Sequence, residues 1–312
     1  MSAPPSEART VEVLGTRHTP GPDLPHHACD THVHVFGPAD RHPYAPDRGY
    51  LPPDALPTDL RALHRHLGIT RTVLVQPSPY GTDNTRLLDG LRTLGVSARG
   101  VAVIDPDTDH RELRAMDRAG VRGVRVNLGA NASNDLERAR ERIRTTARTI
   151  AAFGWHLDLH LDAAALAAVD DLLPRLPVPV ILDHFAGIKP STGTDTDTDT
   201  DTDTDSLART CRLLETGRVW VKLSAPYRAA AGGSYDDLGP ALEALLGTRA
   251  DRALWGSDWP HTGGSPATRH PERVEPFLSV DDGLSLTRLC AHLDASHLRQ
   301  VLVDNPAALY GW

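Results

Sequence analysis

The sequence of 312 residues is poor in the features that mark secreted and membrane proteins. Its three cysteines, Cys29, Cys211 and Cys290, are far apart and form no C-x-x-C pair. No run approaches the roughly 20 consecutive apolar residues of a membrane span. The N-terminal MSAPPSEART lacks the charged and then apolar pattern of a signal peptide. We therefore expect a reduced, cytoplasmic protein that makes no contact with a membrane.

Several motifs are also missing. The sequence holds no G-x-S-x-G, no P-loop and no dinucleotide fingerprint, which disfavours serine hydrolases and nucleotide-binding proteins. It has no basic patch of the kind that binds nucleic acid. The remaining expectation for a partner is a small-molecule substrate, and the sequence leaves homo-oligomerisation open.

The formal charge of −8 comes largely from one repetitive segment. The Thr-Asp alternation over 194–205 contains six aspartates, and without them the charge would be −2. Such a tract repels itself and buries little apolar surface. We therefore predict a disordered loop over 194–205; a calcium loop is disfavoured because the glycine turn and terminal glutamate of an EF-hand are missing.

After a Pro-rich N-terminal tail over 1–25, which we expect to be flexible, short apolar runs alternate with longer amphipathic segments. The apolar runs predict eight strands, at 29–36, 71–77, 99–105, 121–127, 155–161, 178–184, 218–224 and 253–259. Helical patterns separate them. Eight strands that are each followed by a helix predict an α/β fold, a single-domain (β/α)8 TIM barrel over 26–312.

The first predicted strand contains the unusual stretch CDTHVHVFG. Because side chains alternate along a strand, His32 and His34 should leave the backbone on one side together with Asp30. A short His-x-His match can arise by chance, and a strand histidine often has only a structural role. Two neutral imidazoles on one side can also chelate a metal ion.

Polar side chains end several other predicted strands. Catalytic groups of such barrels lie at the carboxyl ends of strands and in the loops that follow. The residues at these ends are Arg125, Asn127, His160, Asp183, His184 and Asp258. We expect them to face one mouth of the barrel together with the histidines of the first strand.

Six segments together resemble the amidohydrolase superfamily: DTHVH, LHLDA, VILDHFAG, WVKLSAPYR, LWGSDWPH and NPAALYG. The resemblance spans residues 29–312. Within it, HVHVFGPADRHPYAPDRGYLPPDA and LVQPSPYGTDN are similar to the branch of 2-pyrone-4,6-dicarboxylate lactonases, whose relatives open sugar lactones and muconolactones. The combination is specific, although each segment alone is weak.

The resemblance implies a set of metal ligands, namely His32, His34, His160 and Asp258, with His184 close to the bound water or substrate. Three imidazoles and one carboxylate suit Zn²⁺, so we expect one divalent ion. Some lactonases of this branch work without metal, and the pyrone enzyme has no histidine at the position of His160. The presence of His160 favours the metal.

A metal-free mechanism uses the same residues. His32 and His34 would polarise the carbonyl oxygen of the substrate as hydrogen-bond donors, while Asp258 would activate an unbound water. In either mechanism we expect Asp258 to be the general base, and His184 is the next candidate.

Substrate binding is also implied by the resemblance. Tyr50, Arg125 and Arg228 match positions that bind carboxylates in the pyrone lactonase, and planar guanidinium groups suit carboxylates. Surface ion pairs are the alternative for both arginines. His261 is a further candidate for the mouth. The pyrone lactonase carries another arginine after strand four, whereas this chain reads NLGANASND, which argues against the pyrone dicarboxylate itself.

Three functions compete. The first is hydrolysis of a lactone or related cyclic ester in a small, anionic metabolite. The second is metal-dependent, non-oxidative decarboxylation of an aromatic or unsaturated acid, because similar barrels catalyse it. The third is a barrel that only binds, which the intact set of ionisable residues disfavours.

Overall fold

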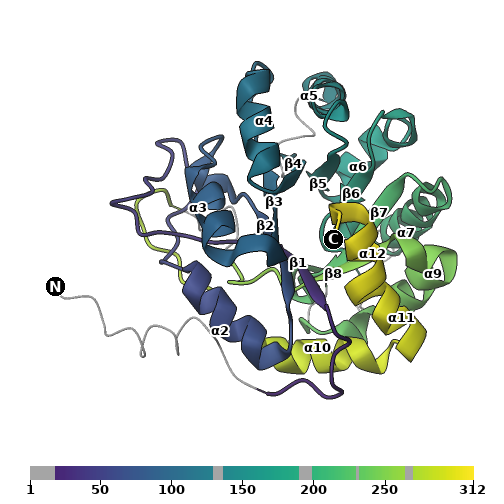
Figure 1. The fold of residues 1–312 in the computed structure, drawn as a ribbon. Helices are drawn as coiled ribbons and strands as arrows, with labels where there is room; N and C mark the ends of the chain where they lie inside the picture. The colour runs from purple at the N-terminus through teal and green to yellow at the C-terminus, as the bar shows by residue number, and fades with distance from the viewer. Residues whose placement is uncertain (1–17, 129–135, 190–198, 230–231, 264–269) are drawn as a thin grey trace.

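The computed structural model describes residues 18–128, 136–189, 199–229, 232–263 and 270–312. Its eight parallel strands follow one another in the order β1 to β8 and form a single-domain (β/α)8 barrel (Figure 1). The strands are β1 (Cys29–Val33), β2 (Arg71–Val75), β3 (Ala98–Ala102), β4 (Val121–Asn127), β5 (His156–His160), β6 (Val180–Leu182), β7 (Val219–Ser224) and β8 (Ala253–Gly256). The predicted fold is confirmed, and each predicted strand overlaps one of these.

Helices surround the strands on the outside of the barrel (Figure 1). They are α2 (Pro57–Leu67), α3 (Thr85–Leu94), α4 (His110–Arg118), α5 (Leu136–Ala151), α6 (Ala163–Val169), α7 (Asp199–Glu215), α8 (Pro226–Ala229), α9 (Gly239–Arg249), α10 (Asp282–Ala291), α11 (Ala295–Arg299) and α12 (Asn305–Tyr310). Four of them begin after an aspartate whose carboxylate accepts a hydrogen bond from a backbone N–H of the first turn: Asp109, Asp162, Asp281 and Asp294. These caps define the residue at which each of the four helices begins.

The barrel closes where the ends of β1 and β8 meet. The amide of His34 donates to the carbonyl of Trp259 at 2.8 Å, and the amide of Asp258 donates to the carbonyl of His32 at 2.9 Å. A Cβ atom on Gly256 would lie 2.6 Å from the Cβ of His32, so this approach requires glycine. The closure places the two histidines of β1 directly beside Asp258.

The expectation that Asp30 shares a side with His32 and His34 is wrong. The register between β1 and β2 shifts between Asp30 and Val33, which breaks the simple alternation of side chains. The carboxylate of Asp30 instead accepts hydrogen bonds from the backbone and the hydroxyl of Ser257, at 2.9 and 2.6 Å, and lies 3.3 Å from His64 on α2. Asp30 therefore ties β1 to β8 and α2.

The predicted N-terminal tail differs from expectation in its last part. Residues 1–17 lie outside the described residues. His18 pairs with Asp281 at 2.5 Å, and the amide of Gly21 donates to Thr287 at 3.1 Å, so this part packs against α10.

The predicted loop over 194–205 also needs correction. Residues 194–198 lie outside the described residues, whereas 199–205 form the first turns of α7 and are helical. Negative side chains are favourable near the N-terminus of a helix, where they face the positive end of its dipole. Asp205 also accepts a hydrogen bond from Arg209 one turn later, at 2.8 Å. Residues 199–205 of the repeat therefore form part of a helix.

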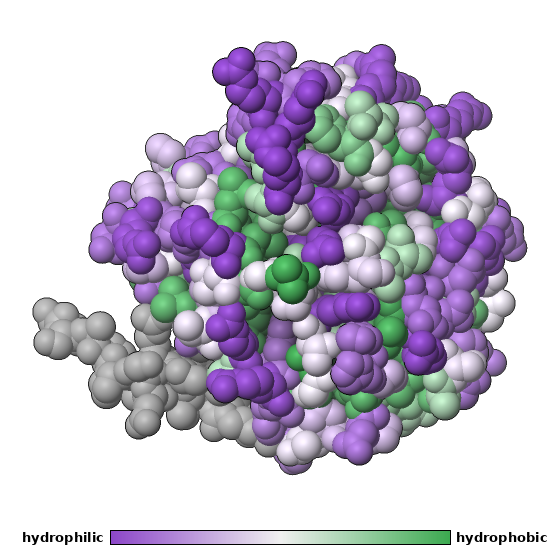
Figure 2. Space-filling view, viewed as in Figure 1, coloured by the Kyte–Doolittle hydropathy of each residue, from purple (hydrophilic) through white to green (hydrophobic). Residues whose placement is uncertain are grey.

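Hydrophilic and apolar residues are interspersed over the face shown in Figure 2. Within the described ranges, no helix combines the length and the apolar character that crossing a membrane requires. All three cysteines are free.

Candidate active site

The predicted mouth contains a polar pocket at the carboxyl ends of the strands. It is lined by His34, Tyr50, Pro77, Ser78, Arg125, Asn127, His160, His184, Arg228, Asp258 and Thr262. These side chains come from distant parts of the sequence, and the barrel brings them together because parallel strands all end at one rim. The pocket-lining residues thus include seven of the strand-end and substrate-binding candidates of the sequence, together with His34.

Asp258 lies at the centre of this pocket, two residues beyond β8, with a left-handed backbone at φ 64°. Its side chain is buried, and its two oxygens face different partners. The Oδ1 atom lies 3.3 Å from Nε2 of His34, 3.6 Å from Nε2 of His32 and 3.9 Å from Nε2 of His184. One carboxylate oxygen therefore faces three imidazoles.

The other oxygen of Asp258 is held in place by two residues of α8, the short helix that follows β7. Its Oδ2 atom accepts hydrogen bonds from the hydroxyl of Tyr227 at 2.6 Å and from Nε of Arg228 at 2.9 Å. Arg228 also donates to the carbonyl of Thr262 at 2.7 Å. Tyr227 was not predicted from the sequence, although its place beside Arg228 in SAPYR was a usable signal.

Each of the three histidines is oriented by its second ring nitrogen. Nδ1 of His34 lies 2.8 Å from the carbonyl oxygen of Val75, which can only accept, so this nitrogen carries the proton. Nε2 of His34 faces the pocket and Asp258. Nδ1 of His184 lies 2.9 Å from the hydroxyl of Ser224.

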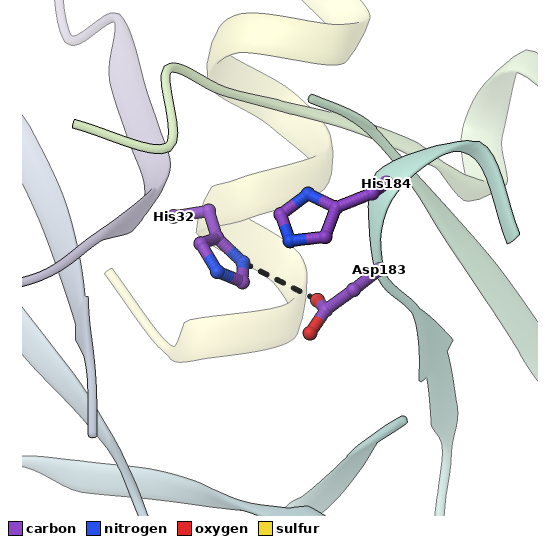
Figure 3. A group of neighbouring side chains, drawn as sticks. All are labelled: His32, Asp183 and His184. Carbon is purple, nitrogen blue, oxygen red and sulfur yellow. Dashed lines mark ion pairs between the residues drawn. The ribbon is translucent and has the colours of Figure 1, made fainter. Parts of the chain in front are cut away.

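A buried charged network lies next to His32. Figure 3 shows Asp183 of the β6 end directed at the ring of His32, with His184 beside it; Nδ1 of His32 is 3.3 Å from Oδ1 of Asp183. Lys222 of β7, fully buried, lies 2.5 Å from Asp158 and 3.1 Å from Asp183. Lys222 was not predicted from the sequence, although a lysine inside the apolar strand VWVKLS is itself unusual.

Burial and charge together set the protonation states of these groups. Burial lowers the pKa of His32 to about 4 and, reinforced by the charge of Arg125, that of His160 to about 3. Burial also holds the pKa of His184 well below its ordinary value. Burial acts in the opposite direction on Asp258, but the charge of Arg228 and the neighbouring histidines together outweigh it and keep the pKa of Asp258 well below its usual range. At neutral pH the site therefore contains an ionised carboxylate beside the neutral imidazoles of His32, His160 and His184.

The side chains fit a divalent ion by their spacing and by their unused atoms. Ligand atoms of His32, His34 and Asp258 lie within 4.8 Å of one another, and a second set of the same span consists of His32, Asp183 and His184. Among the described residues, Nε2 of His32 and Oδ1 of Asp258 are buried without a hydrogen-bond partner. A cation would satisfy both atoms.

His160 was the fourth predicted ligand and is not in either set. It ends β5, lines the pocket, and its ring centre is 5.2 Å from that of His184. The structure thus brings three of the four predicted ligands together and leaves His160 at the pocket wall.

The predicted substrate-binding residues separate into two groups. Tyr50 and Arg125 line the pocket, and Arg228 does so while it holds Asp258. His261 is buried, with Nε2 3.0 Å from Asp282 of α10, and is not among the pocket-lining side chains. The expectation for His261 is therefore corrected, because Nε2 of its ring is already paired with the buried carboxylate of Asp282 on α10.

The fold and the pocket define a hydrolase-like barrel, and the sequence assigns it to a family. The chain belongs to the amidohydrolase family, which its sequence matches over residues 29–312. It is an enzyme of that family.

Individual relatives cover almost the whole chain. The chain is 34% identical over 297 residues to a 2-pyrone-4,6-dicarboxylate hydrolase of Comamonas testosteroni, covering 92% of this chain and 91% of the relative. It is 34% identical over 294 residues to a 4-sulfomuconolactone hydrolase of Rhizobium radiobacter, with the same coverage. A zinc-bound amidohydrolase of Burkholderia multivorans has the same fold, with a TM-score of 0.62 at 22% identity, covering 91% of this chain and 98% of that one.

Proposed function

We propose that this enzyme hydrolyses a lactone of a small, carboxylate-bearing metabolite. The observation that carries the proposal is the arrangement of the two Asp258 oxygens: Oδ2 is held by Tyr227 and Arg228, while Oδ1 faces three imidazoles in a polar pocket. The two relatives at 34% identity are both named as hydrolases of cyclic esters, which supports the same class of substrate here.

Asp258 would act as the general base. Its ionised Oδ1 would take a proton from a water molecule as the water oxygen forms a bond to the carbonyl carbon of the lactone. When the ring C–O bond breaks, the same carboxyl would return the proton to the departing oxygen. Donors in the pocket would stabilise the negative charge that develops on the carbonyl oxygen.

Arg125 is the group best placed to bind a substrate carboxylate. Its side chain is only 7% exposed, and its Nε lies 3.4 Å from Oδ2 of Asp183. The terminal nitrogens of the planar guanidinium can therefore donate hydrogen bonds to an anion in the pocket. Arg228 would contribute less, because Asp258 and Thr262 already use its Nε and one terminal nitrogen.

We also propose that the site can hold one zinc ion through His32, His34 and Asp258, with His160 and His184 nearby. When bound, zinc would lower the pKa of a water and polarise the substrate carbonyl. The zinc-bound barrel of Burkholderia multivorans supports this choice of metal. We further propose a cytoplasmic location and a small-molecule substrate as the partner, and homo-oligomerisation is left open.

A two-part experiment tests the function. The enzyme is incubated with a panel of sugar lactones, muconolactones and matched acids, and net acid release is recorded beside released CO₂. Acid release without CO₂ from a carboxylate-bearing lactone is the expected result; CO₂ release would favour decarboxylation and contradict the proposal. Elemental analysis after zinc supplementation, with activity followed during chelation, separates the zinc-assisted mechanism from the metal-free one.

A further inference from the structure

Lys222 is a buried charged residue that the proposed reaction does not use. It lies on β7 with its side chain fully buried inside the barrel. Its Nζ atom has three close partners: Oδ2 of Asp158 at 2.5 Å, Oδ1 of Asp183 at 3.1 Å and Nδ1 of His32 at 3.2 Å. The third contact connects Lys222 to His32, one of the histidines that face Asp258.

The chemistry of an ammonium group determines the direction of that contact. An ammonium has three donors and no acceptor, and two carboxylates beside it keep it charged. Its hydrogen bond to His32 therefore requires Nδ1 to accept with its lone pair. In a neutral imidazole the single ring proton must then be on Nε2.

Asp183 competes for the same ring nitrogen. Its Oδ1 lies 3.3 Å from Nδ1 of His32, as Figure 3 shows, and would accept a proton from that atom. The contact of Lys222 with Nδ1 is 3.2 Å long and meets hydrogen-bond geometry, and the same ammonium can donate to Oδ1 of Asp183, 3.1 Å away. The geometry favours donation from Lys222.

His34 has the opposite arrangement. Its Nδ1 is 2.8 Å from the carbonyl of Val75 and must donate, so in the neutral imidazole the lone pair is on Nε2. The neutral forms of the two histidines in the His-x-His stretch thus present different groups to Oδ1 of Asp258. Neutral His32 presents an N–H, and neutral His34 presents a lone pair.

We propose that Lys222 is a positioning residue that holds His32 in the tautomer with its proton on Nε2. His32 then enters the pocket as a hydrogen-bond donor, suited to the carbonyl oxygen of a substrate. Metal ligation through Nε2 requires the proton to be on Nδ1, from which His32 would donate a hydrogen bond to Asp183. Lys222 therefore opposes metal binding through His32. This inference deepens the proposed function and rests on its assignment of His32 to the site.

The test uses a charge-balanced pair of substitutions. Lys222→Met alone would leave Asp158 and Asp183 against Arg125, and an unpaired buried charge can prevent folding. Lys222→Met with Asp158→Asn removes one positive and one negative charge and leaves Asp183 paired with Arg125. The matched control is Asp158→Asn alone, which retains the contacts of Lys222 with Asp183 and His32.

The first readout is the ¹⁵N spectrum of the histidine rings in metal-free protein at fixed neutral pH, with the His32 signals identified by their loss in His32→Gln. We expect a protonated Nε2 in the wild type and in Asp158→Asn, and a protonated Nδ1 in the double variant. A wild type with its proton on Nδ1, measured without any variant, would overturn the proposal. So would a folded double variant that keeps the proton on Nε2.

The second readout is the dissociation constant of zinc, measured by competition with a chelating dye. We expect the double variant to bind zinc more tightly, by on the order of tenfold, because neighbours of metal-bound histidines change affinity by this much. Unchanged or weaker binding relative to Asp158→Asn would contradict the opposing role of Lys222. Neither readout needs a substrate, so failure of the lactonase proposal would leave this test intact.

Discussion

Asp258→Asn tests the catalytic assignment most directly, because the environment of Asp258 predicts how the new amide will be oriented. Tyr227 and Arg228 both donate to the Oδ2 position, so the carbonyl oxygen of the asparagine should occupy it. The amide nitrogen is then forced into the Oδ1 position, 3.3 Å from Nε2 of His34. The substitution replaces Oδ1, the carboxylate oxygen of Asp258 that faces the histidines, with a hydrogen-bond donor. It keeps the two hydrogen bonds that hold the side chain.

The expected effect on rate is large, and the expected effect on folding is smaller. Removing a positioned general base costs about 10²–10⁴-fold in rate, which corresponds to about 3–5 kcal/mol. The two retained hydrogen bonds limit the loss of stability. Arg228 loses its charged partner but is 27% exposed, so water compensates in part.

The assay is the steady-state kcat on the lactone that turns over fastest, with circular dichroism and thermal unfolding to confirm the fold. Asp171→Asn is the matched control, since Asp171 follows α6, pairs with Arg140 and has a half-exposed side chain. It should leave kcat unchanged. A folded Asp258→Asn enzyme with kcat near the wild-type value would refute the assignment, and His184 would become the candidate base.

Three further predictions concern the surroundings of this carboxylate. Tyr227→Phe removes the 2.6 Å hydrogen bond to Asp258 and should lower kcat by about tenfold with little change in KM, since Arg228 still holds the oxygen; an equal rise of KM would point to substrate contact instead. Arg125→Met should raise KM by roughly 10–100-fold for a carboxylate-bearing lactone and have little effect on a neutral analogue, and equal losses on both substrates would contradict a carboxylate site. The free energy of unfolding of the metal-free enzyme should fall as the pH is lowered from 7 towards 4. The reason is that the unfolded chain protonates its histidines near 6.5, whereas the folded pKa of His32 is about 4 and that of His160 about 3. Urea unfolding measured at several pH values in this range should show that the free energy of unfolding depends less steeply on pH in His160→Gln. An identical pH dependence would argue against the contribution of His160.

Local sequence patterns were sufficient to predict the architecture and most of the pocket. Eight apolar runs separated by helical patterns are a property of local periodicity, and a barrel is the arrangement that buries all of them. Because every parallel strand ends at the same rim, polar residues at strand ends could be assigned to one mouth before any distance was known. His34, Arg125, His160, His184 and Asp258 were all placed there for this reason.

Tertiary structure alone decided how those residues are paired. The register shift in β1 turned Asp30 towards Ser257, a buried carboxylate on α10 engaged His261, and the aspartates of 199–205 joined a helix. The partners of Lys222 also come from three different strands. Local patterns report which side of a strand or helix is buried, but hydrogen-bond partners depend on distances between segments far apart in the chain. The tautomers of His32 and His34, and hence what each can offer a substrate or a metal, follow only from those distances.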